Sequence, residues 1–323
     1  MLGKLKSLAP SRDRAQTVVG ISLHRALALA ALPPSSRATV QLAELPTEPA
    51  GQVKALSNIV ASLGLRGCPA AITLPPGSYS LLQIERPPVE DDELVAAARW
   101  RVGSMLDYPV EEAVLQVFDA PLPNDRQRTP MLNVVAAPAR SVRDLASVVK
   151  KAGLVPQKVT VAELAIRDLV GQVESDNGPV VTVFLTGRQG LIQVTHNGQI
   201  HLSRRLDYGL SSVKPVDVLA TGIQNTLPLE LRRTIDYFDS HFSAGSIRRV
   251  LAGPAETVFM NFMRQAGEAV GFNVAPLELI ADLQPVPSKS ADYGLPEAYF
   301  ALGGALSLRA AAGIEDAVET VAV

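Results

Sequence analysis

Residues 180–206, VVTVFLTGRQGLIQVTHNGQIHLSRRL, predict three consecutive β-strands. Apolar residues recur in three short runs, which are separated by Gly187–Gly190 and by Asn197-Gly198. An Asn-Gly pair between β-rich runs is a strong hairpin signal, because a type I′ turn needs positive φ at both central residues. The stretch therefore predicts an antiparallel three-stranded meander, which we interpret as the start of a second domain.

The composition bounds the class of protein. A chain of 323 residues with 47% apolar and 19% charged residues fits a globular protein of two lobes. The net charge of −2 and the scattered Arg pairs at 204, 232 and 248 give no basic surface for nucleic acid. The single cysteine, Cys68, permits no intrachain disulfide and suits a reducing compartment such as the cytoplasm. We expect no membrane span and no secretion signal, since no apolar run is long enough.

The first part of the chain has an order of elements like that of the meander region. Residues 17–31 alternate around Gly20 and predict a hairpin, and 40–45 predict a third strand. Residues 51–65 carry apolar side chains at helical spacing and predict an amphipathic helix, which is followed by a strand at 70–74. The predicted order is strand, strand, strand, helix, strand.

Residues 79–162 predict an inserted βαββαβ subdomain with its own small core. Its first helix is expected at 89–106. The four acids Glu90 to Glu93 precede this helix, where they complement the positive end of the helix dipole, so we interpret them as helix-stabilising residues and not as metal ligands. Trp100, the only tryptophan, is expected to pack in the core on the face of Ala96, Ala97 and Leu106.

After the meander the pattern predicts alternating helices and strands. Helices are expected at 163–173, 216–226, 229–242, 256–270 and 295–312, and strands at 247–252 and 272–276. The last helix is rich in Ala and Gly, whose small side chains allow close approach to a neighbouring element.

Common catalytic signatures do not occur in this sequence. It contains no P-loop, no dinucleotide-binding glycine motif, no nucleophile elbow and no zinc-protease motif. The four histidines (His24, His196, His201 and His241) are far apart, and His196 beside Asn197-Gly198 is interpreted as a turn residue. We therefore expect no metal site.

The ordered series of segments resembles a known family. The series is VVGISLHRALALAAL (18–32), the stretch from AAITLPPGSY to VLQVFDAP (70–121), MLNVVAAPARSVRDLASVVKKAGLVPQKVTVAELAIRDLV (131–170), the meander, and LELRRTIDYFDSHFSAGSIRRVLAG (229–253). It is similar to the actin-like proteins of type IV pilus and type II secretion platforms, that is, to the PilM family, most closely its MshI branch of mannose-sensitive pilus biogenesis, and to the cytoplasmic domains of GspL-type secretion proteins. The resemblance covers nearly the whole chain.

The resemblance implies a mixed α/β, two-lobed actin-like ATPase fold of the ribonuclease H-like class. The N-terminal tail would be residues 1–16. The first lobe would be 17–178, with the insertion at 79–162, and the second lobe would be 179–323, with a C-terminal helix able to pack back on the first.

The chain departs from the family at the positions that hold nucleotide. In actin-like ATPases the turns of the two opening hairpins bind phosphates through backbone N–H groups, and an acid in each organises Mg²⁺. Here Ser22 stands in place of the first acid and Phe184 or Leu185 in place of the second. Four residues are left as vestigial nucleotide-binding positions: Ser22, Thr186, Gly187 and Gly253. We therefore expect no catalytic residue, no metal, and neither ATP nor Mg²⁺ as a cofactor.

The expected function is that of a scaffold and not of an enzyme. The resemblance implies a cytoplasmic protein, peripheral to the inner membrane and able to form homo-oligomers, that binds the cytoplasmic tail of a PilN- or MshJ-like bitopic membrane protein. The expected binding groove lies between the insertion and the first sheet and includes Leu81, Ile84, Arg99 and Val102. Two alternatives stay open. One is an active ATPase whose Mg²⁺ ligands come from elsewhere, for example Asp207 or Glu230, and the other is a small-molecule kinase of the sugar-kinase type.

Overall fold

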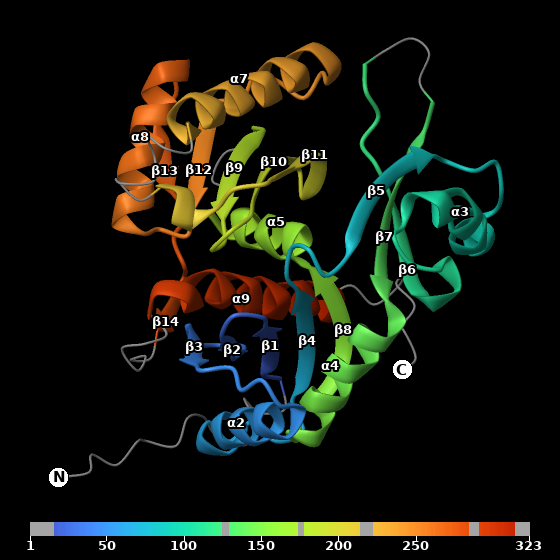
Figure 1. Cartoon of the computed structure of the whole chain (residues 1–323), viewed down its shortest axis with the longest axis vertical. Helices are drawn as coiled ribbons and strands as arrows, with labels where there is room; N and C mark the ends of the chain where they lie inside the picture. The colour runs from blue at the N-terminus through green and yellow to red at the C-terminus, as the bar shows by residue number, and fades with distance from the viewer. Residues whose placement is uncertain (1–15, 125–128, 174–177, 214–221, 284–290, 314–323) are drawn as a thin grey trace. The chain divides into compact units, whose positions relative to one another are not determined.

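The chain divides into two compact units (Figure 1). The computed structural model describes residues 16–124, 129–173, 178–213, 222–283 and 291–313. Unit 1 contains the described residues of Met1–Pro75, Arg140–Leu169 and Ile280–Val323, and unit 2 contains those of Pro76–Ala139 and Val170–Leu279. Each unit has its own sheet and its own hydrophobic core.

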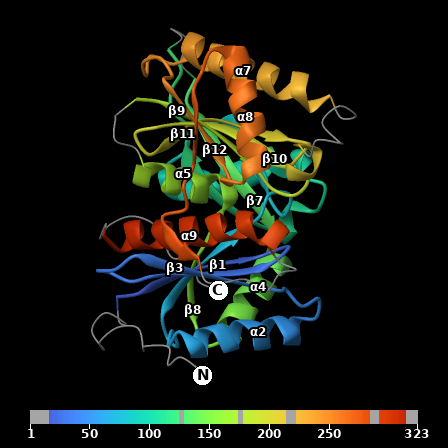
Figure 2. The ribbon, with the colours of Figure 1, turned by 90° about the vertical axis from the view of Figure 1, so that its left-hand side faces the viewer.

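Unit 1 is built on a six-stranded sheet in the order β14-β3-β2-β1-β4-β8. Its strands are β1 Val18–Leu23, β2 Leu27–Leu32, β3 Ala38–Ala43, β4 Pro69–Leu74, β8 Val155–Val161 and β14 Ala281–Leu283, and its helices are α2 Pro49–Ser62, α4 Ala139–Lys151 and α9 Ala291–Gly313. Strands β1 to β3 pair antiparallel, and β4 and β8 continue the sheet in parallel with β1. Helices α2 and α4 cover one face and α9 covers the other (Figure 2).

The two faces of β1 explain this layering. Val19 and Ile21 point into the core beneath α2 and α4. On the opposite face Gly20 allows α9 to come so close that a Cβ at this position would lie 1.7 Å from the carbonyl oxygen of Ala301. The closest part of this helix contact therefore depends on a residue without a side chain.

Unit 2 repeats the strand order of unit 1. Its five-stranded sheet is β11-β10-β9-β12-β13, in which β9 to β11 pair antiparallel and β12 and β13 continue in parallel with β9. The strands are β9 Val180–Leu185, β10 Gly190–His196, β11 Gln199–Leu206, β12 Arg249–Gly253 and β13 Val274–Pro276, and α7 Ile223–His241 and α8 Thr257–Val270 pack on one face. Asn197 and Gly198 have φ of 51° and 70°, so the predicted hairpin turn is confirmed.

A three-stranded sheet, β5-β7-β6, forms the inserted subdomain. Its elements are β5 Ser80–Glu85, α3 Leu94–Val102, β6 Ala113–Asp119 and β7 Met131–Pro138, with short 3₁₀ turns at Asp91–Glu93, Gly103–Met105 and Val110–Glu112. Leu94, Ala98 and Val102 of α3 are buried against the sheet. The acids before α3 lie in its first turns, as predicted.

Two expectations about this subdomain are corrected. Its compact part ends near Ala139 and not at 162, because β8 pairs with β4 and α4 packs into the core of unit 1. Trp100 is 89% exposed instead of lying in the core. The helix buries the series Leu94, Ala98, Val102, which leaves the Trp100 side in solvent.

The later helices also differ from expectation. One helix, α7, runs through Pro228, although a break was predicted there. The proline removes one backbone donor near the start of the helix, but Leu227 and Leu231 on either side of it are buried in the same core, which offsets that loss. Helix α9 belongs to unit 1, and the short strand β14 before it was not predicted. Among the described residues no helix is long and apolar enough to cross a membrane.

Candidate functional site

The turn between β1 and β2 binds a carboxyl group of the protein itself. Ser22 lies at the end of β1, and its Oγ donates a hydrogen bond to Oε2 of Glu297 on α9. The backbone N–H of Arg25, in the turn, donates to Oε1 of the same carboxylate at 3.5 Å. Glu297 is 1% exposed, and Ser22 is completely buried. An anion from α9 thus occupies donors of the first hairpin.

Burial changes the acidity of this carboxyl group. Removal from water raises the pKa of Glu297 to about 7, against the opposing effect of the hydrogen bonds from Ser22 and Arg25. The acid that position 22 lacks is therefore replaced by one from 275 residues along the chain. The sequence analysis missed Glu297. The signal that could have found it is a single acidic residue within the apolar, Ala- and Gly-rich run 295–308.

The turn between β9 and β10 is closed by its own hydrogen bonds. The N–H of Thr186 donates to the carbonyl of Gln189 at 2.7 Å, and Oγ1 of Thr186 donates to the same oxygen at 2.9 Å. The N–H of Gln189 donates back to Oγ1 of Thr186 at 3.4 Å. The carbonyl of Gly187 accepts from Ser211 at 3.1 Å. Polar groups of the second hairpin are thus largely engaged within unit 2.

Strand β9 offers no oxygen ligand at the position of the second acid. Leu185 points into the core shared with α7 and α8. Phe184 lies on the other face, paired with Gly253 of β12. A Cβ on Gly253 would lie 2.8 Å from Cδ2 of Phe184, so the aromatic ring occupies the space above this glycine. Both Phe184 and Leu185 are fully buried.

The structure brings some of the vestigial nucleotide positions together. Thr186 and Gly187 follow directly after Phe184 on β9, and Gly253 pairs with Phe184 on the neighbouring strand, so these three lie in one region of unit 2. Ser22 belongs to unit 1, where its partner is Glu297.

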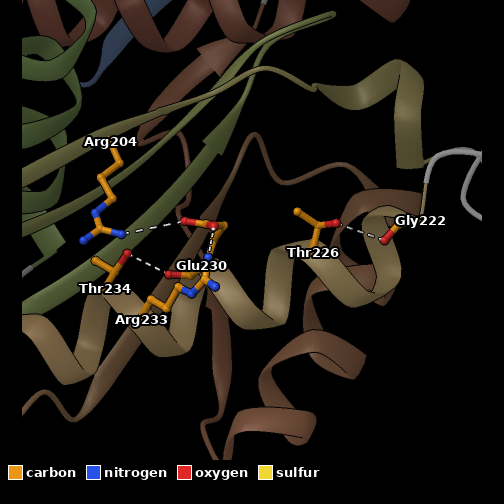
Figure 3. Close-up of polar contacts among 6 residues, drawn as sticks. All are labelled: Arg204, Gly222, Thr226, Glu230, Arg233 and Thr234. Atoms are coloured by element: carbon orange, nitrogen blue, oxygen red, sulfur yellow. Dashed lines mark hydrogen bonds and ion pairs between the residues drawn. The ribbon is translucent and has the colours of Figure 1, made fainter.

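Glu230, suggested as an alternative Mg²⁺ ligand, is held by two arginines (Figure 3). Its Oε2 lies 3.7 Å from Nη1 of Arg204 on β11, and its Oε1 lies 3.2 Å from Nη1 of Arg233 on the next turn of α7. Metal coordination would have to break both ion pairs. Asp207, the other suggestion, is exposed just after β11. The described ranges contain no group of three His, Cys, Asp or Glu side chains placed to hold a metal ion.

The residues expected in the partner groove are largely used inside the inserted subdomain. Ile84 is 5% exposed and Val102 is fully buried. Arg99 donates from Nη1 to the carbonyl oxygens of Val110 and Ala113, the latter at 3.2 Å. Leu81 is half-buried on β5, which is an edge strand as predicted. The backbone of β5, more than these side chains, is the available feature.

Comparison with known proteins identifies the fold. No protein-family model matches the chain, and no curated protein matches its sequence. A chain of the PilM-PilN type IV pilus biogenesis complex is similar with a TM-score of 0.66 and 18% identity, over 90% of this chain and 98% of that one. A Bacteroides thetaiotaomicron protein with an actin-like ATPase fold has a TM-score of 0.51 and 9% identity, over 87% and 96% of the two chains.

A weaker similarity is found to the cytoplasmic domain of EpsL, an inner-membrane component of the type II secretion system of Vibrio cholerae. Its TM-score is 0.46 at 12% identity, over 77% of this chain and 93% of that one. The two stronger similarities, together with the repeated strand order, show that the chain has the mixed α/β, actin-like fold. The resemblance to PilM that the sequence indicates is thus confirmed at the level of fold.

Proposed function

We propose that this protein is a cytoplasmic scaffold of the inner-membrane platform that assembles a type IV pilus of the mannose-sensitive type. In this role it lies at the inner membrane and binds the cytoplasmic tail of a bitopic membrane protein of the PilN or MshJ kind. Its nucleotide cleft is degenerate, so assembly depends on binding and not on ATP hydrolysis.

The partner part of the proposal is supported by fold and by an available strand edge. The similar solved chain comes from a complex of PilM with PilN, and it is matched over almost its full length. Strand β5 pairs only with β7 in its sheet, so its other edge presents backbone donors and acceptors. An extended peptide can add to such an edge, with backbone hydrogen bonds giving affinity and alternate side-chain contacts giving specificity.

The occupied first hairpin carries the nucleotide part of the proposal. Glu297 binds both the hydroxyl of Ser22 and the N–H of Arg25, which are donors that a phosphate group would need. A phosphate entering this turn would meet a buried carboxyl group, and like charges at close range repel. The apolar pair Phe184 and Leu185 leaves the second hairpin without a metal ligand.

Hydrogen exchange tests the partner. The probe is a synthetic peptide with the sequence of the cytoplasmic tail of the PilN- or MshJ-like protein encoded with this chain. We expect protection to rise chiefly in residues 79–106, with the largest gain in backbone amides of β5. Protection confined to β9–β13 and α7–α8, while a binding titration confirms the complex, would place the partner elsewhere and contradict this docking edge.

Phosphate release with and without Mg²⁺ tests the nucleotide cleft. We expect no Mg²⁺-dependent release above the buffer control and no saturable binding of a fluorescent ATP analogue. The variant Ser22→Asp is not expected to restore turnover, because the second hairpin still lacks its acid and the new carboxylate faces Glu297. Clear Mg²⁺-dependent turnover by the unmodified protein would refute the scaffold proposal in favour of an active ATPase.

A further inference from the structure

Helix α3 leaves a large aromatic side chain in solvent. Trp100 is 89% exposed, and Met105, in the 3₁₀ turn that follows the helix, is 54% exposed. Glu93 precedes Trp100 by seven residues, or about two helical turns, so the two lie on the same side, with the small residues Ala96 and Ala97 between them. These five residues are called the α3 outer face below. It is a shallow strip with an acid at one end and an aromatic ring at the other.

The inserted subdomain around this face is strongly acidic. Residues 76–124 and 129–139 contain nine acids and three arginines. All nine acids are exposed: Glu85, Glu90, Asp91, Asp92, Glu93, Asp107, Glu111, Glu112 and Asp119. The whole chain, in contrast, has a formal charge of only −2. The negative charge is thus concentrated in one small part of the fold.

The three arginines do not neutralise the α3 outer face. Arg86 pairs with Asp91 and Asp119 at the start of the helix. Arg101 lies 4.0 Å from Glu85. Arg99 donates to backbone carbonyls instead of to an acid. Six of the acids therefore have no ion pair within the described part of the chain: Glu90, Asp92, Glu93, Asp107, Glu111 and Glu112.

We propose that the α3 outer face is a docking surface for a short basic segment that carries Lys or Arg next to an apolar side chain. A cationic head over the face of the Trp100 ring gains cation–π attraction, and the aliphatic stem covers Ala96 and Ala97. A second basic residue, about two turns or an equivalent distance away, pairs with Asp92 or Glu93. Exposed tryptophan with charged neighbours is the composition of binding hot spots and not of ordinary surface.

The proposed function supplies a partner with this chemistry, and the identity of the occupant rests on that proposal. Cytoplasmic segments next to a membrane span are enriched in Lys and Arg. A tail that adds to the edge of β5 would continue, outside its extended part, into such a basic segment. Docking on α3 would hold this segment through charge and the aromatic ring, in addition to the strand edge.

The same surface is poorly suited to the membrane itself. Tryptophan is common at membrane interfaces, but the cytoplasmic leaflet is negatively charged and repels a surface bearing Asp92 and Glu93. A second copy of the chain is the other available occupant. These two occupants are outcomes of the test below.

The single tryptophan makes the test direct, because the intrinsic emission of the protein reports on Trp100 alone. The probes are a twelve-residue peptide of alternating Lys and Leu, its Glu and Leu counterpart, and vesicles containing phosphatidylserine. At about 0.15 M salt we expect the basic peptide to shift or quench the emission saturably, and the acidic peptide and the vesicles to have no effect. Raising the salt to about 1 M should weaken the binding.

Variants locate the site through the anisotropy of a labelled basic peptide. Trp100→Ala and Glu93→Lys are each expected to weaken binding by at least about fivefold. Asp239→Lys, which reverses an equally exposed acid on α7, serves as the matched control and should leave the affinity unchanged. Because Glu93, Trp100 and Asp239 are all exposed, these changes should not unfold the protein.

Equal binding by all variants would overturn the proposal. So would an emission change caused by vesicles alone, which would make the face a membrane contact, or by increasing protein concentration alone, which would make it a contact between copies. The outcome is separable from that of the partner proposal. A membrane-partner tail that binds with unchanged affinity to Trp100→Ala refutes the α3 site only, whereas a basic peptide that binds at Trp100 while the tail does not bind refutes the partner only.

Discussion

A single carboxyl group decides the state of the first hairpin. Glu297 reaches across from α9 and satisfies the hydroxyl of Ser22, so neither buried group is left without a partner. An isolated buried carboxylate would cost several kcal/mol. Part of that cost remains, as the pKa of about 7 for Glu297 indicates. The protein thus keeps a destabilising group where actin-like ATPases hold nucleotide.

Replacing this group should change how stability depends on pH. The folded-state pKa of Glu297, about 7, lies above its unfolded value of 4.5, so the folded state takes up the proton more readily. Its burial cost is absent below about pH 4.5 and grows as pH rises to about 7. Relative to the unmodified protein, Glu297→Gln should gain on the order of 3 kcal/mol of unfolding free energy between pH 4.5 and 8.

Urea titrations at several pH values measure this difference. Glu44→Gln, an exposed glutamate in the same unit, is the control and should show no such trend. A difference between Glu297→Gln and the unmodified protein that does not vary with pH would mean that Glu297 has an ordinary acidity.

At the scale of elements, the contact of α9 with β1 depends on small residues. Gly20 on the strand and Gly303 and Gly304 on the helix each lie where a Cβ would enter a neighbouring atom. The last two would meet the carbonyl of Ala165 at 2.3 Å and Oγ1 of Thr73 at 2.5 Å. Thr73 also donates to the carbonyl of Phe300 at 2.8 Å, which fixes the helix along the sheet.

Adding one methyl group at Gly20 should therefore be costly. Gly20→Ala would place its Cβ 1.7 Å from a backbone oxygen of α9, so the helix must shift, and we expect a loss of about 3 kcal/mol or more. The matched control is Gly171→Ala in α5 (Ala162–Val173), where nothing lies within 4 Å of a Cβ. That change should be neutral or stabilise by up to about 1 kcal/mol.

Denaturant unfolding of the two variants provides the comparison. If Gly20→Ala unfolds at the same urea concentration as the unmodified protein, the close approach of α9 is not required for the fold of unit 1. Position 20 is far enough from Trp100 in the chain to leave the emission of the native state as a check on the inserted subdomain.

At the scale of the whole molecule, the two units carry buried groups with opposite responses to acid. In unit 2, His201 packs against the rings of Phe238 and Phe242, with centroid distances of 5.5 and 5.0 Å. Burial lowers the pKa of His201 to about 4, and His196 nearby lowers it further. In unit 1, burial raises the pKa of Glu297.

Acidification should therefore shift local stability in opposite directions. Because the folded-state pKa of His201 lies below its unfolded value of 6.5, unit 2 loses stability as pH falls from 6.5 towards 4. Unit 1 gains stability over nearly the same range, since Glu297 becomes protonated. From pH 7.5 to 5.5 we expect unit 2 to lose at most about 1 kcal/mol, because His201 is only half-buried and solvent screens its charge.

Hydrogen exchange, corrected for the intrinsic rate at each pH, measures both units at once. Protection of Gly190–His196 should fall and protection of Val18–Leu23 should rise on acidification. His201→Leu should remove the first change and leave the second. Parallel changes in both strands would show that the units open together or that other groups dominate the pH response.

Local patterns in the sequence determined the elements and their order. The alternation in 180–206 with Asn197-Gly198 predicts the meander, since turn geometry depends on φ of adjacent residues. The repeated order of strands and helices predicts both sheets for the same reason, because each period is set within a few residues. The loss of the nucleotide acids could also be seen, once the resemblance had aligned Ser22 and Phe184.

Only the tertiary structure decided which surfaces are buried and which distant groups meet. Trp100 was expected in the core, but α3 has two apolar sides, and the sheet beneath it selects Leu94, Ala98 and Val102. Strand β8 joins unit 1 because β4 offers it a parallel edge, which no pattern within β8 reveals. The pairing of Ser22 with Glu297 spans 275 residues, and contacts of that separation depend on how whole elements pack and not on local propensity.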